Sequence, residues 1–404
     1  MIKCINIDWF QYQVICARLA LSNIGDRIED YEVYDTKIVF PNYRRAFEVR
    51  DRRNRTLFYY GVGSSVPGAD EHSCSVKVEN ALLYTGEWNK LLHDFLKKAG
   101  ATIKNITRLD ICCDINMFAN ELRPAELIRC YLYGGMYNPI RKGSNQFSIM
   151  GNKSLESIDL QTIRFGSATS AVKVYMYNKT KELEEVKDKP YIRECWERVG
   201  LDCSDVWRIE ISITSAGTFL KRKQENVKDD FFHNEIIALD NYRFLRLRGD
   251  MLRTEYEIRN IFITYQREYF RFVDNQGQKF TKDMREIRLF DFSDDVVLYK
   301  PCSMKSYIKV GRTEKVVANK LFEVCETYND LTTDERKVLY DAGRIFERLG
   351  ALKNSTSRQL EDMFLAELRT SQTSLDAWYR IKAQFGYNIR DLKLLINILN
   401  SIKQ

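Results

Sequence analysis

Short stretches in which apolar and polar residues alternate dominate the first half of the chain, and this pattern is typical of β-strands. These stretches, rich in Val, Ile, Tyr and Phe and separated by turn residues, lie at 3–20, 31–40, 46–62, 103–115, 145–150, 161–167, 171–178 and 206–214. Apolar residues at helical spacing predict helices near 85–99, 123–133 and 180–200. Hairpins mixed with single helices predict an α+β fold with largely antiparallel sheets.

The second half of the chain changes to helical periodicity. Residues 228–270 are predicted to be mainly helical, and the pattern becomes entirely helical towards the C-terminus. We therefore place a domain boundary near 310–316. Residues 1–315 are expected to form the α+β part, with sheets arranged as ferredoxin- or RRM-like palm lobes, and residues 316–404 an all-helical C-terminal domain.

Three of the predicted strands divide their side chains between an apolar and a polar face, because successive side chains of a strand point to opposite sides. They are 108–115, 171–178 and 206–214. Their polar faces carry Arg108, Asp110, Cys112 and Asp114 on the first strand, Lys173, Tyr175 and Tyr177 on the second, and Arg208, Glu210, Ser212 and Thr214 on the third. If these strands are neighbours in one sheet, ~4.8 Å apart, their acidic and phenolic groups converge.

Converging carboxylates suit a hard divalent cation such as Mg²⁺ or Mn²⁺. The Cα atoms of Asp110 and Asp114 are ~13 Å apart in a regular strand, so without a bulge both cannot bind one ion. We therefore expect Asp110 and Glu210 to be the metal ligands and rank Asp114 behind them. A solvated sheet face shows the same alternation more often than a metal site does, so the hypothesis depends on the strands being adjacent.

Composition and charge indicate an ordinary globular protein and argue against several other classes. Hydrophobic residues make up 44% and charged residues 29% of the chain, as in ordinary globular proteins, and the net charge of +7 is a mild basic excess. The ten Cys form no CxxC pair and only three His are present, which argues against a zinc site. Neither a signal peptide nor a membrane-spanning stretch is expected, and the unpaired thiols favour a reducing cytoplasm.

One segment combines basic and aromatic residues. Its arginines are Arg44, Arg45, Arg50, Arg52, Arg53 and Arg55, and its aromatic neighbours are Tyr43, Phe47, Phe58, Tyr59 and Tyr60. Arginine interleaved with aromatic rings suits contact with phosphates and stacking on unpaired bases. A charged hairpin partly neutralised by Glu48 and Asp51 explains the same pattern equally well, and both interpretations stay open.

The ordered set of strand motifs resembles the replication initiation factor family, which comprises plasmid rolling-circle replication initiators and related relaxases of conjugative elements. The resemblance is carried by TRLDICCD (107–114), TIRFGSATSAVKVYMYNKTKE (162–182) and VWRIEISI (206–213), in the family's order. The early IDWFQYQV (7–14) is similar to the family's first strand. The similarity spans about residues 5–290 and is strongest over 107–213.

By position, the resemblance implies that Tyr177 is the nucleophile that attacks the origin phosphodiester, in a YNK motif with Asn178 and Lys179. It places the family's acidic positions on Asp110, Asp114 and Glu210. The basic residue usually found two positions before the nucleophile is replaced by Tyr175, which makes Tyr175 a second candidate.

The chemistry implied is a metal-dependent transesterification that leaves a 5′-phosphotyrosine and a free 3′-OH and that can be reversed to reseal the strand. Lys179 is expected to assist the phenolate, and Lys173 and Arg208 are expected to contact DNA. The expected setting is a bacterial cytoplasm. The implied partners are origin DNA, single-stranded or hairpin at the nick, and a helicase of host or element. A homodimer is left open, and no membrane partner is expected.

Two other functions stay open at this stage. The first is a non-catalytic DNA-binding protein on the same fold, such as a regulator of a mobile element. The second is a metal-dependent phosphodiesterase that uses water in place of tyrosine. Nickases that depend on paired histidines on one strand are excluded, because His72, His93 and His233 form no such pair.

Overall fold

The computed structural model describes residues 2–66, 69–138, 147–153, 158–223, 237–239, 242–274, 284–292 and 299–302. The chain divides into two compact units, Met1–Leu220 with Arg246–Pro301 and Lys221–Leu245 with Cys302–Gln404. The predicted helical domain at 316–404 lies outside the described residues, so that domain and its boundary stay predictions.

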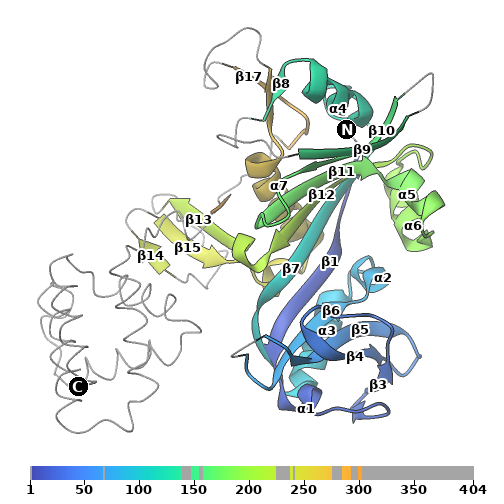
Figure 1. The fold of residues 1–404 in the computed structure, drawn as a ribbon, viewed down its shortest axis with the longest axis vertical. Coiled ribbons are helices and arrows are strands. Elements are labelled where there is room, and N and C mark those ends of the chain that lie inside the picture. Colours follow the sequence, from blue (N-terminus) through green and yellow to red (C-terminus); the bar gives the residue numbers. More distant parts are fainter. Residues whose placement is uncertain are drawn as a thin grey trace, which may run out of the picture. The chain divides into compact units, whose positions relative to one another are not determined.

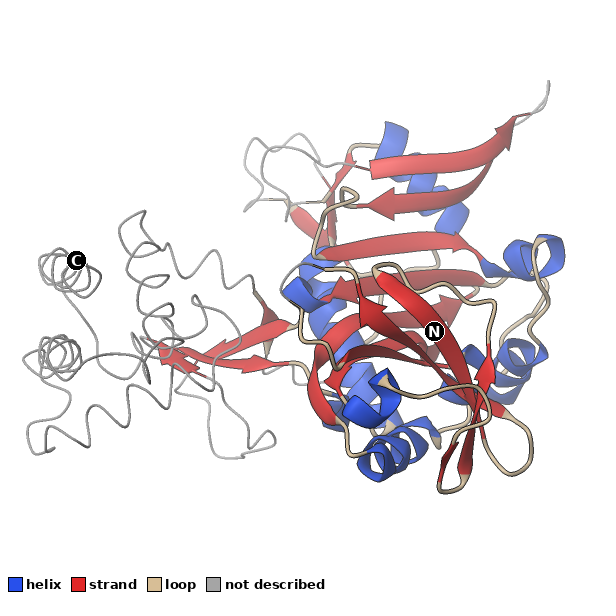
Figure 2. Cartoon of the chain, turned by 60° about the horizontal axis from the view of Figure 1, so that its bottom comes forward, coloured by secondary structure: helices blue, strands red, loops and turns tan. Residues whose placement is uncertain are grey.

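A large antiparallel sheet dominates the first unit. Within the described residues it has eleven strands in the order β2-β3-β4-β5-β6-β1-β7-β12-β11-β10-β9. The bounds are β1 Cys4–Ile15, β2 Arg27–Ile28, β3 Tyr31–Asp35, β4 Tyr43–Arg50, β5 Thr56–Ser64, β6 Ser73–Val78, β7 Thr102–Ile115, β9 Phe147–Lys153, β10 Ile158–Phe165, β11 Val172–Asn178 and β12 Trp207–Thr214. The strands turn progressively from one edge of the sheet to the other (Figure 2), as L-amino-acid strands do.

Two long strands form the middle of this sheet. β1 has 12 residues and β7 has 14, and they run side by side through the whole unit (Figure 1). Each begins a lobe with the same connectivity. In the first lobe β3 to β6 form a meander whose last strand pairs with β1, and in the second β9 to β12 form one whose last strand pairs with β7. The β1–β7 pair therefore holds two similarly connected lobes in one sheet.

The longer helices cover the apolar face of the sheet. The helices are α1 Ala17–Ala20, α2 Asn80–Leu83, α3 Trp88–Ala99, α4 Pro124–Tyr133, α5 Lys179–Glu185, α6 Pro190–Val199 and α7 Glu255–Tyr269. α3 packs on the first lobe, where the rings of Phe95 and Phe58 stack at 5.1 Å, and it reaches Phe10 of β1 through Trp88 at 4.7 Å. α7 packs against β1, β7, β11 and β12. This burial of aromatic and aliphatic side chains supplies the main stabilisation of the unit.

The remaining elements are short. β8 Met136–Tyr137, β16 Phe272–Asp274 and β17 Arg285–Ile287 form a three-stranded sheet of order β17-β16-β8. β14 Ile237–Leu239 pairs with β15 Tyr242–Arg246, and β13 Phe219–Lys223 and β18 Lys300–Pro301 complete the strands that the structure describes. Short 3-10 turns lie at Ser215–Gly217 and Gly249–Met251.

The coarse fold class predicted from the sequence is confirmed: the described residues form an α+β structure with antiparallel sheets. The prediction that 228–270 is mainly helical is confirmed for α7 and wrong for 237–239 and 242–246, which form β14 and β15. β6 was not predicted, although Cys74, Val76 and Val78 alternate with the polar Ser73, Ser75 and Lys77 in SCSVKV, as in a strand with one apolar face. One continuous sheet spans both lobes, with the apolar face of each covered by one long helix.

Candidate active site

Strand register brings the three polar strand faces together. β7, β12 and β11 are consecutive neighbours in the sheet. Three rows of facing residues result: Asp114, Arg208 and Tyr177; Cys112, Glu210 and Tyr175; and Asp110, Ser212 and Lys173. The β7–β12 pairing runs without a bulge from Arg108 to Ile115, so Asp110 and Asp114 stay in separate rows.

The phenol of Tyr177 lies between an acid and an amine. Its hydroxyl donates to Glu210 Oε2 at 2.9 Å and accepts from Lys179 Nζ at 3.5 Å. Lys179 is the first residue of α5, is almost fully buried and is also paired with Glu182. Tyr177 is part-buried on the polar face of the sheet. Tyr175 faces Glu210 across the strands, but the hydroxyl that Glu210 accepts from is that of Tyr177.

Asp110 forms the next part of the site. Arg108, two residues earlier on β7, donates to its carboxylate through Nε at 3.1 Å and through a second nitrogen at 2.5 Å. Asp110 is buried, whereas the Arg108 side chain is 43% exposed. The guanidinium therefore closes the solvent side of the acidic group.

Asp8 belongs to the same site although sequence reasoning missed it. The register between β1 and β7 shifts between Ile7 and Trp9, which marks Asp8 as the extra residue of a β-bulge. The bulge turns Asp8 and Trp9 to the same face, where simple alternation predicts opposite faces. The available sequence signal was the apolar spacing of β1, in which the buried Ile7 and Phe10 are three residues apart instead of two.

Arg208 is a buried cation in the row next to Glu210, on the same face of the sheet. Its Nε and one terminal nitrogen bind the two oxygens of Asp114 at 2.7 Å each, and its other terminal nitrogen binds Asp8 Oδ1 at 2.7 Å. Tyr84 donates to the same Asp8 oxygen at 2.7 Å, and the indole of Trp196 on α6 donates to Asp114 at 2.7 Å. Every charge in this network thus has a close partner of opposite sign.

This network changes the roles of two predicted residues. Arg208, expected to contact DNA, has no exposed surface, and its guanidinium is held by two carboxylates. Asp114, ranked last among the metal ligands, has both oxygens bound by Arg208 and is not available to a cation. Both residues instead form a buried ion pair that joins β12 to β7 next to the site.

Burial shifts the pKa values of the three carboxyl groups nearest to Tyr177 and Arg108. Burial, followed by the charges of Asp110 and Asp8, raises the pKa of Glu210 to about 7. Burial also raises the pKa of Asp110, against the opposing effect of Arg108. Burial alone would raise the pKa of Asp8, but Arg208 and Lys179 hold it below its usual value. Of these three acids, Glu210 is the one whose charge changes near neutral pH.

The nucleophile and its amine are shifted as well. Burial and then the charge of Glu210 raise the pKa of Tyr177 well above its ordinary value. Burial and then Arg208 lower the pKa of Lys179. The phenol is therefore protonated at rest, and its proton needs an acceptor before the oxygen can attack.

The acids fit a hard divalent cation in chemical kind. The residues described contain no group of three or more His, Cys, Asp or Glu already at metal-binding distances. Asp110 and Glu210 nevertheless lie in adjacent rows of neighbouring strands, and their mutual repulsion contributes to the raised pKa of Glu210. A cation would relieve that repulsion, with Asp8 as the third nearby oxygen donor.

The arginine segment divides into differently placed groups. Arg44 and Arg45 lie in the first half of β4, both exposed, and Arg45 covers the ring of Phe47 at 4.8 Å. Three arginines at or near the following turn have acidic partners: Arg50 with Glu48, Arg52 with Asp30 and Arg55 with Asp51. Arg53 is exposed in the turn itself. The charged-hairpin interpretation therefore fits Arg50, Arg52 and Arg55 better than a continuous basic patch does.

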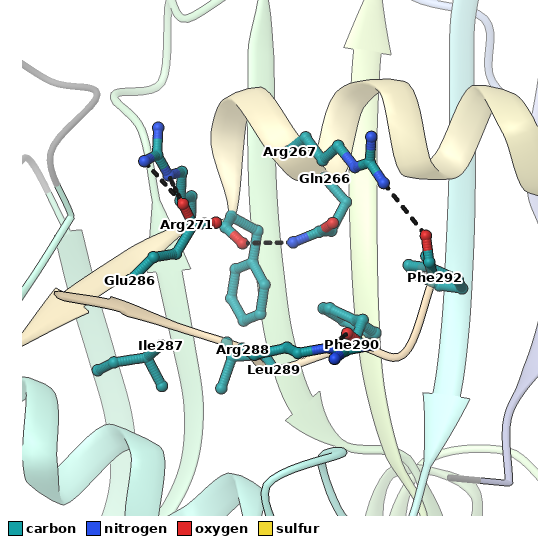
Figure 3. A pocket seen from close by; sticks show the side chains of 10 residues that line it. Gln266, Arg267, Arg271, Glu286, Ile287, Arg288, Leu289, Phe290 and Phe292 are labelled. Carbon is teal, nitrogen blue, oxygen red and sulfur yellow. Dashed lines mark hydrogen bonds and ion pairs between the residues drawn. The ribbon is translucent and has the colours of Figure 1, made fainter. Parts of the chain in front are cut away.

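A pocket of about 560 Å³ lies away from this chemistry, on the α7 side of the sheet (Figure 3). Its basic side chains are engaged: Arg267 donates to the Phe292 carbonyl at 3.2 Å, and Arg271 pairs with Glu286 at 2.7 Å. None of the predicted site residues lines it.

Comparisons with known proteins add one structure. No family model and no curated protein matches the chain. A solved structure of the rolling circle replication initiator protein from Geobacillus stearothermophilus is similar, with a TM-score of 0.39 and 14% identity over 71% of this chain and 93% of that one. At this level the similarity carries no argument about function. The helices that the structure describes include none long and apolar enough to cross a bilayer.

We expect Asp114→Asn to destabilise the protein strongly, because it leaves the buried Arg208 without its two-oxygen partner. Breaking a buried pair in this way costs about 3–5 kcal/mol. The measurement is the free energy of unfolding in urea. Asp110→Asn is the matched control, and we expect a much smaller loss because the part-exposed Arg108 regains water. Equal losses for the two variants would contradict a structural role for the Arg208–Asp114 pair.

We expect Glu210→Gln to stabilise the protein above neutral pH. A carboxyl whose pKa is about 7 when folded, against an ordinary value of 4.5, contributes stability below pH 4.5 that is lost as the pH rises through 7. Glutamine cannot lose a proton, so the melting temperature of the variant should exceed that of the wild type by about 3–5 °C at pH 8 and by little at pH 4.5. Glu184→Gln, on the exposed side of α5, should show no such trend. A difference between Glu210→Gln and wild type that does not change with pH would refute the shifted pKa.

Proposed function

We propose that this protein is a tyrosine-dependent DNA nicking and joining enzyme that acts at a rolling-circle replication or transfer origin of a mobile element. The observation that supports this most is the hydroxyl of Tyr177, 2.9 Å from Glu210 and 3.5 Å from the Lys179 amine. A phenol with a base and a cation at its oxygen is the arrangement needed for a nucleophile that attacks a phosphodiester. The family motifs quoted above agree with this role for Tyr177.

The reaction divides its tasks among the residues of the site. Tyr177 Oη attacks the phosphorus, and Glu210 accepts the phenolic proton along their hydrogen bond. The bond between phosphorus and the 3′ oxygen breaks, and that oxygen takes a proton from solvent to give the free 3′-OH. The 5′ phosphate stays on Tyr177, and attack by a 3′-OH on this ester reverses the steps and rejoins the strand.

Charge determines which residues assist each step. Lys179 lies beside the attacking oxygen and can stabilise negative charge that develops there. Its lowered pKa does not prevent this, since Asp8 and Glu182 both favour its charged form. Asp110 and Glu210, with Asp8, are the residues that would hold a divalent metal, Mg²⁺ or Mn²⁺. When bound, such an ion neutralises charge on the phosphoryl oxygens.

We expect Tyr177→Phe to abolish covalent capture of DNA. A library of single-stranded oligonucleotides with a random centre is incubated with the protein and Mn²⁺, and adducts are isolated under denaturing conditions. The wild type should yield a nucleotide-modified peptide that contains residue 177, and Tyr177→Phe should yield none.

Tyr175→Phe is the matched control, because it removes a neighbouring phenol from the same strand face. If Tyr175→Phe loses the adduct and Tyr177→Phe keeps it, the nucleophile is Tyr175. Cleavage without any adduct, unchanged in Tyr177→Phe, would indicate a phosphodiesterase that uses water. Binding without cleavage in either metal would indicate a non-catalytic DNA-binding protein.

We expect the rate of adduct formation to depend on the ionisation of Glu210. Without metal, the pKa of about 7 leaves this carboxylate half ionised at neutral pH, and a cation held by Glu210 and Asp110 would lower that pKa. The single-turnover rate with Mn²⁺ should therefore rise about tenfold per pH unit in acid and level off below pH 7. Glu210→Gln should be slow and should lose this rise. A Glu210→Gln profile with the same shape as that of the wild type would exclude Glu210 as the proton acceptor.

A further inference from the structure

The polar face continues from the candidate active site into the first lobe, and its centre is the indole of Trp9. The Lys77 amine lies 3.5 Å from the centre of the Trp9 ring, and the Arg108 guanidinium lies 4.2 Å from the same centre. Lys77 comes from β6 and Arg108 from β7, the two strands that flank β1. One aromatic ring thus gathers two cations from its two neighbouring strands.

Trp9 is itself held in place. Its indole nitrogen donates to Gln11 Oε1 at 3.0 Å, and the Gln11 amide donates to Ser75 Oγ at 2.6 Å. The bulge at Asp8 turns the ring to the polar face. The two cations are therefore positioned by a fixed ring and not by flexible surface side chains.

Only one of the two cations has an anionic partner. Arg108 is bonded to Asp110, but within the part of the chain that the structure describes the Lys77 amine makes no ion pair. Glu79, the acid that acts on Lys77 most strongly, is bonded to the Tyr59 hydroxyl. Burial lowers the pKa of Lys77, and the charge of Arg108 lowers it further. Lys77 and Arg108 therefore repel each other across the Trp9 ring, and an anion bound between them would reduce this repulsion.

Aromatic and basic side chains extend this surface across the first lobe. The Tyr59 ring lies 5.8 Å from the Lys77 amine, and Arg50 covers the ring of Tyr34 at 4.4 Å. Strand register places Tyr59 opposite Lys77 and Tyr34 opposite Glu48, the neighbour of Tyr59 on β4. α3 and its buried aromatic contacts lie on the other face of the sheet.

We propose that this surface, centred on Trp9, Lys77 and Arg108, binds the single-stranded DNA that adjoins the nick. The proposal rests on the proposed function, because it takes the strand held at Tyr177 as its occupant. From β11 to β6 the surface crosses four strand spacings, about 19 Å, and Arg108 lies about 20 Å along β7 from the row of Tyr177. That diagonal spans several nucleotides. Phosphates would lie between Lys77 and Arg108, and bases would stack on part-exposed rings such as Tyr59.

The test measures DNA binding without cleavage. The full-length chain carrying Tyr177→Phe is titrated in EDTA with a fluorescein-labelled oligothymidylate of about 12 nucleotides, a length within the site sizes of single-strand binders. Anisotropy gives the affinity at several salt concentrations. A single phosphate contact on single-stranded DNA contributes about 0.7 to the slope of log affinity against log salt.

We expect Lys77→Gln to reduce that slope by about 0.7. From 1 M to 0.1 M salt, a slope difference of about 0.7 amounts to a factor of about five, so binding at 0.1 M salt should be about fivefold weaker. Lys90→Gln is the matched control, an exposed lysine of α3 on the other face of the sheet, and it should bind like the parent. Trp9→Leu should weaken binding and also diminish the further effect of Lys77→Gln, because the amine loses the ring that positions it.

Failure of this proposal can be told apart from failure of the proposed function. If Lys77→Gln and Lys90→Gln bind equally while the wild type still forms the Tyr177 adduct, the binding surface is refuted and the enzyme stands. If Lys77→Gln weakens binding but no adduct forms, the surface stands and the nicking activity is refuted. Tighter binding of a duplex than of the oligothymidylate would refute the single-stranded occupant.

Discussion

The site depends on one buried cation. Arg208 has no exposed surface, and burying a charge is costly unless it is paired and fully hydrogen-bonded. Asp114 and Asp8 supply this pairing, and they come from the two long strands on which both lobes are built. Removing Arg208 leaves both carboxylates without their cation, and removing Asp114 leaves Arg208 without the partner that binds it through two oxygens. These ion pairs hold β1, β7 and β12 side by side. They thereby also fix the position of Glu210 on β12, which accepts a hydrogen bond from Tyr177.

The position of the Arg208 charge explains why the neighbouring carboxyl groups differ in pKa. Asp114 and Asp8 share the guanidinium of Arg208, and this cation holds the pKa of Asp8 below its usual value. Glu210 accepts a hydrogen bond from the neutral phenol of Tyr177, and the partner of Asp110 is the part-exposed Arg108, so burial raises the pKa of both acids. Neighbouring carboxylates thus have separate roles: Asp114 and Asp8 are structural, and Glu210 and Asp110 are chemical. Perturbed pKa values commonly mark such a division at functional sites.

Much of this could be predicted from the sequence, and the reason is periodicity. Alternation along 108–115, 171–178 and 206–214 assigned the polar faces correctly, and the family's motif order indicated that these strands belong together. Two things escaped. Alternation says which face a side chain is on but not whether it is buried there, so Arg208 was mistaken for a surface residue. A bulge breaks alternation at one position, so Asp8 could not be recognised as a partner of residues about 100 and 200 positions away. For the arginines near 50 the sequence left two interpretations open, and it could not indicate that Arg52 pairs with Asp30, which is distant in sequence.

The bulge at Asp8 has a mechanical consequence. It is one of three places where β1 shifts register against β7, and strands with irregular pairing cannot slide by a residue without losing every matched contact. The two lobes therefore share a rigid common axis. A polymer that contacts both lobes would be held at two points whose separation is set by the β1–β7 pair. The sheet itself, and not a loop, would therefore determine the distance between the two contacts.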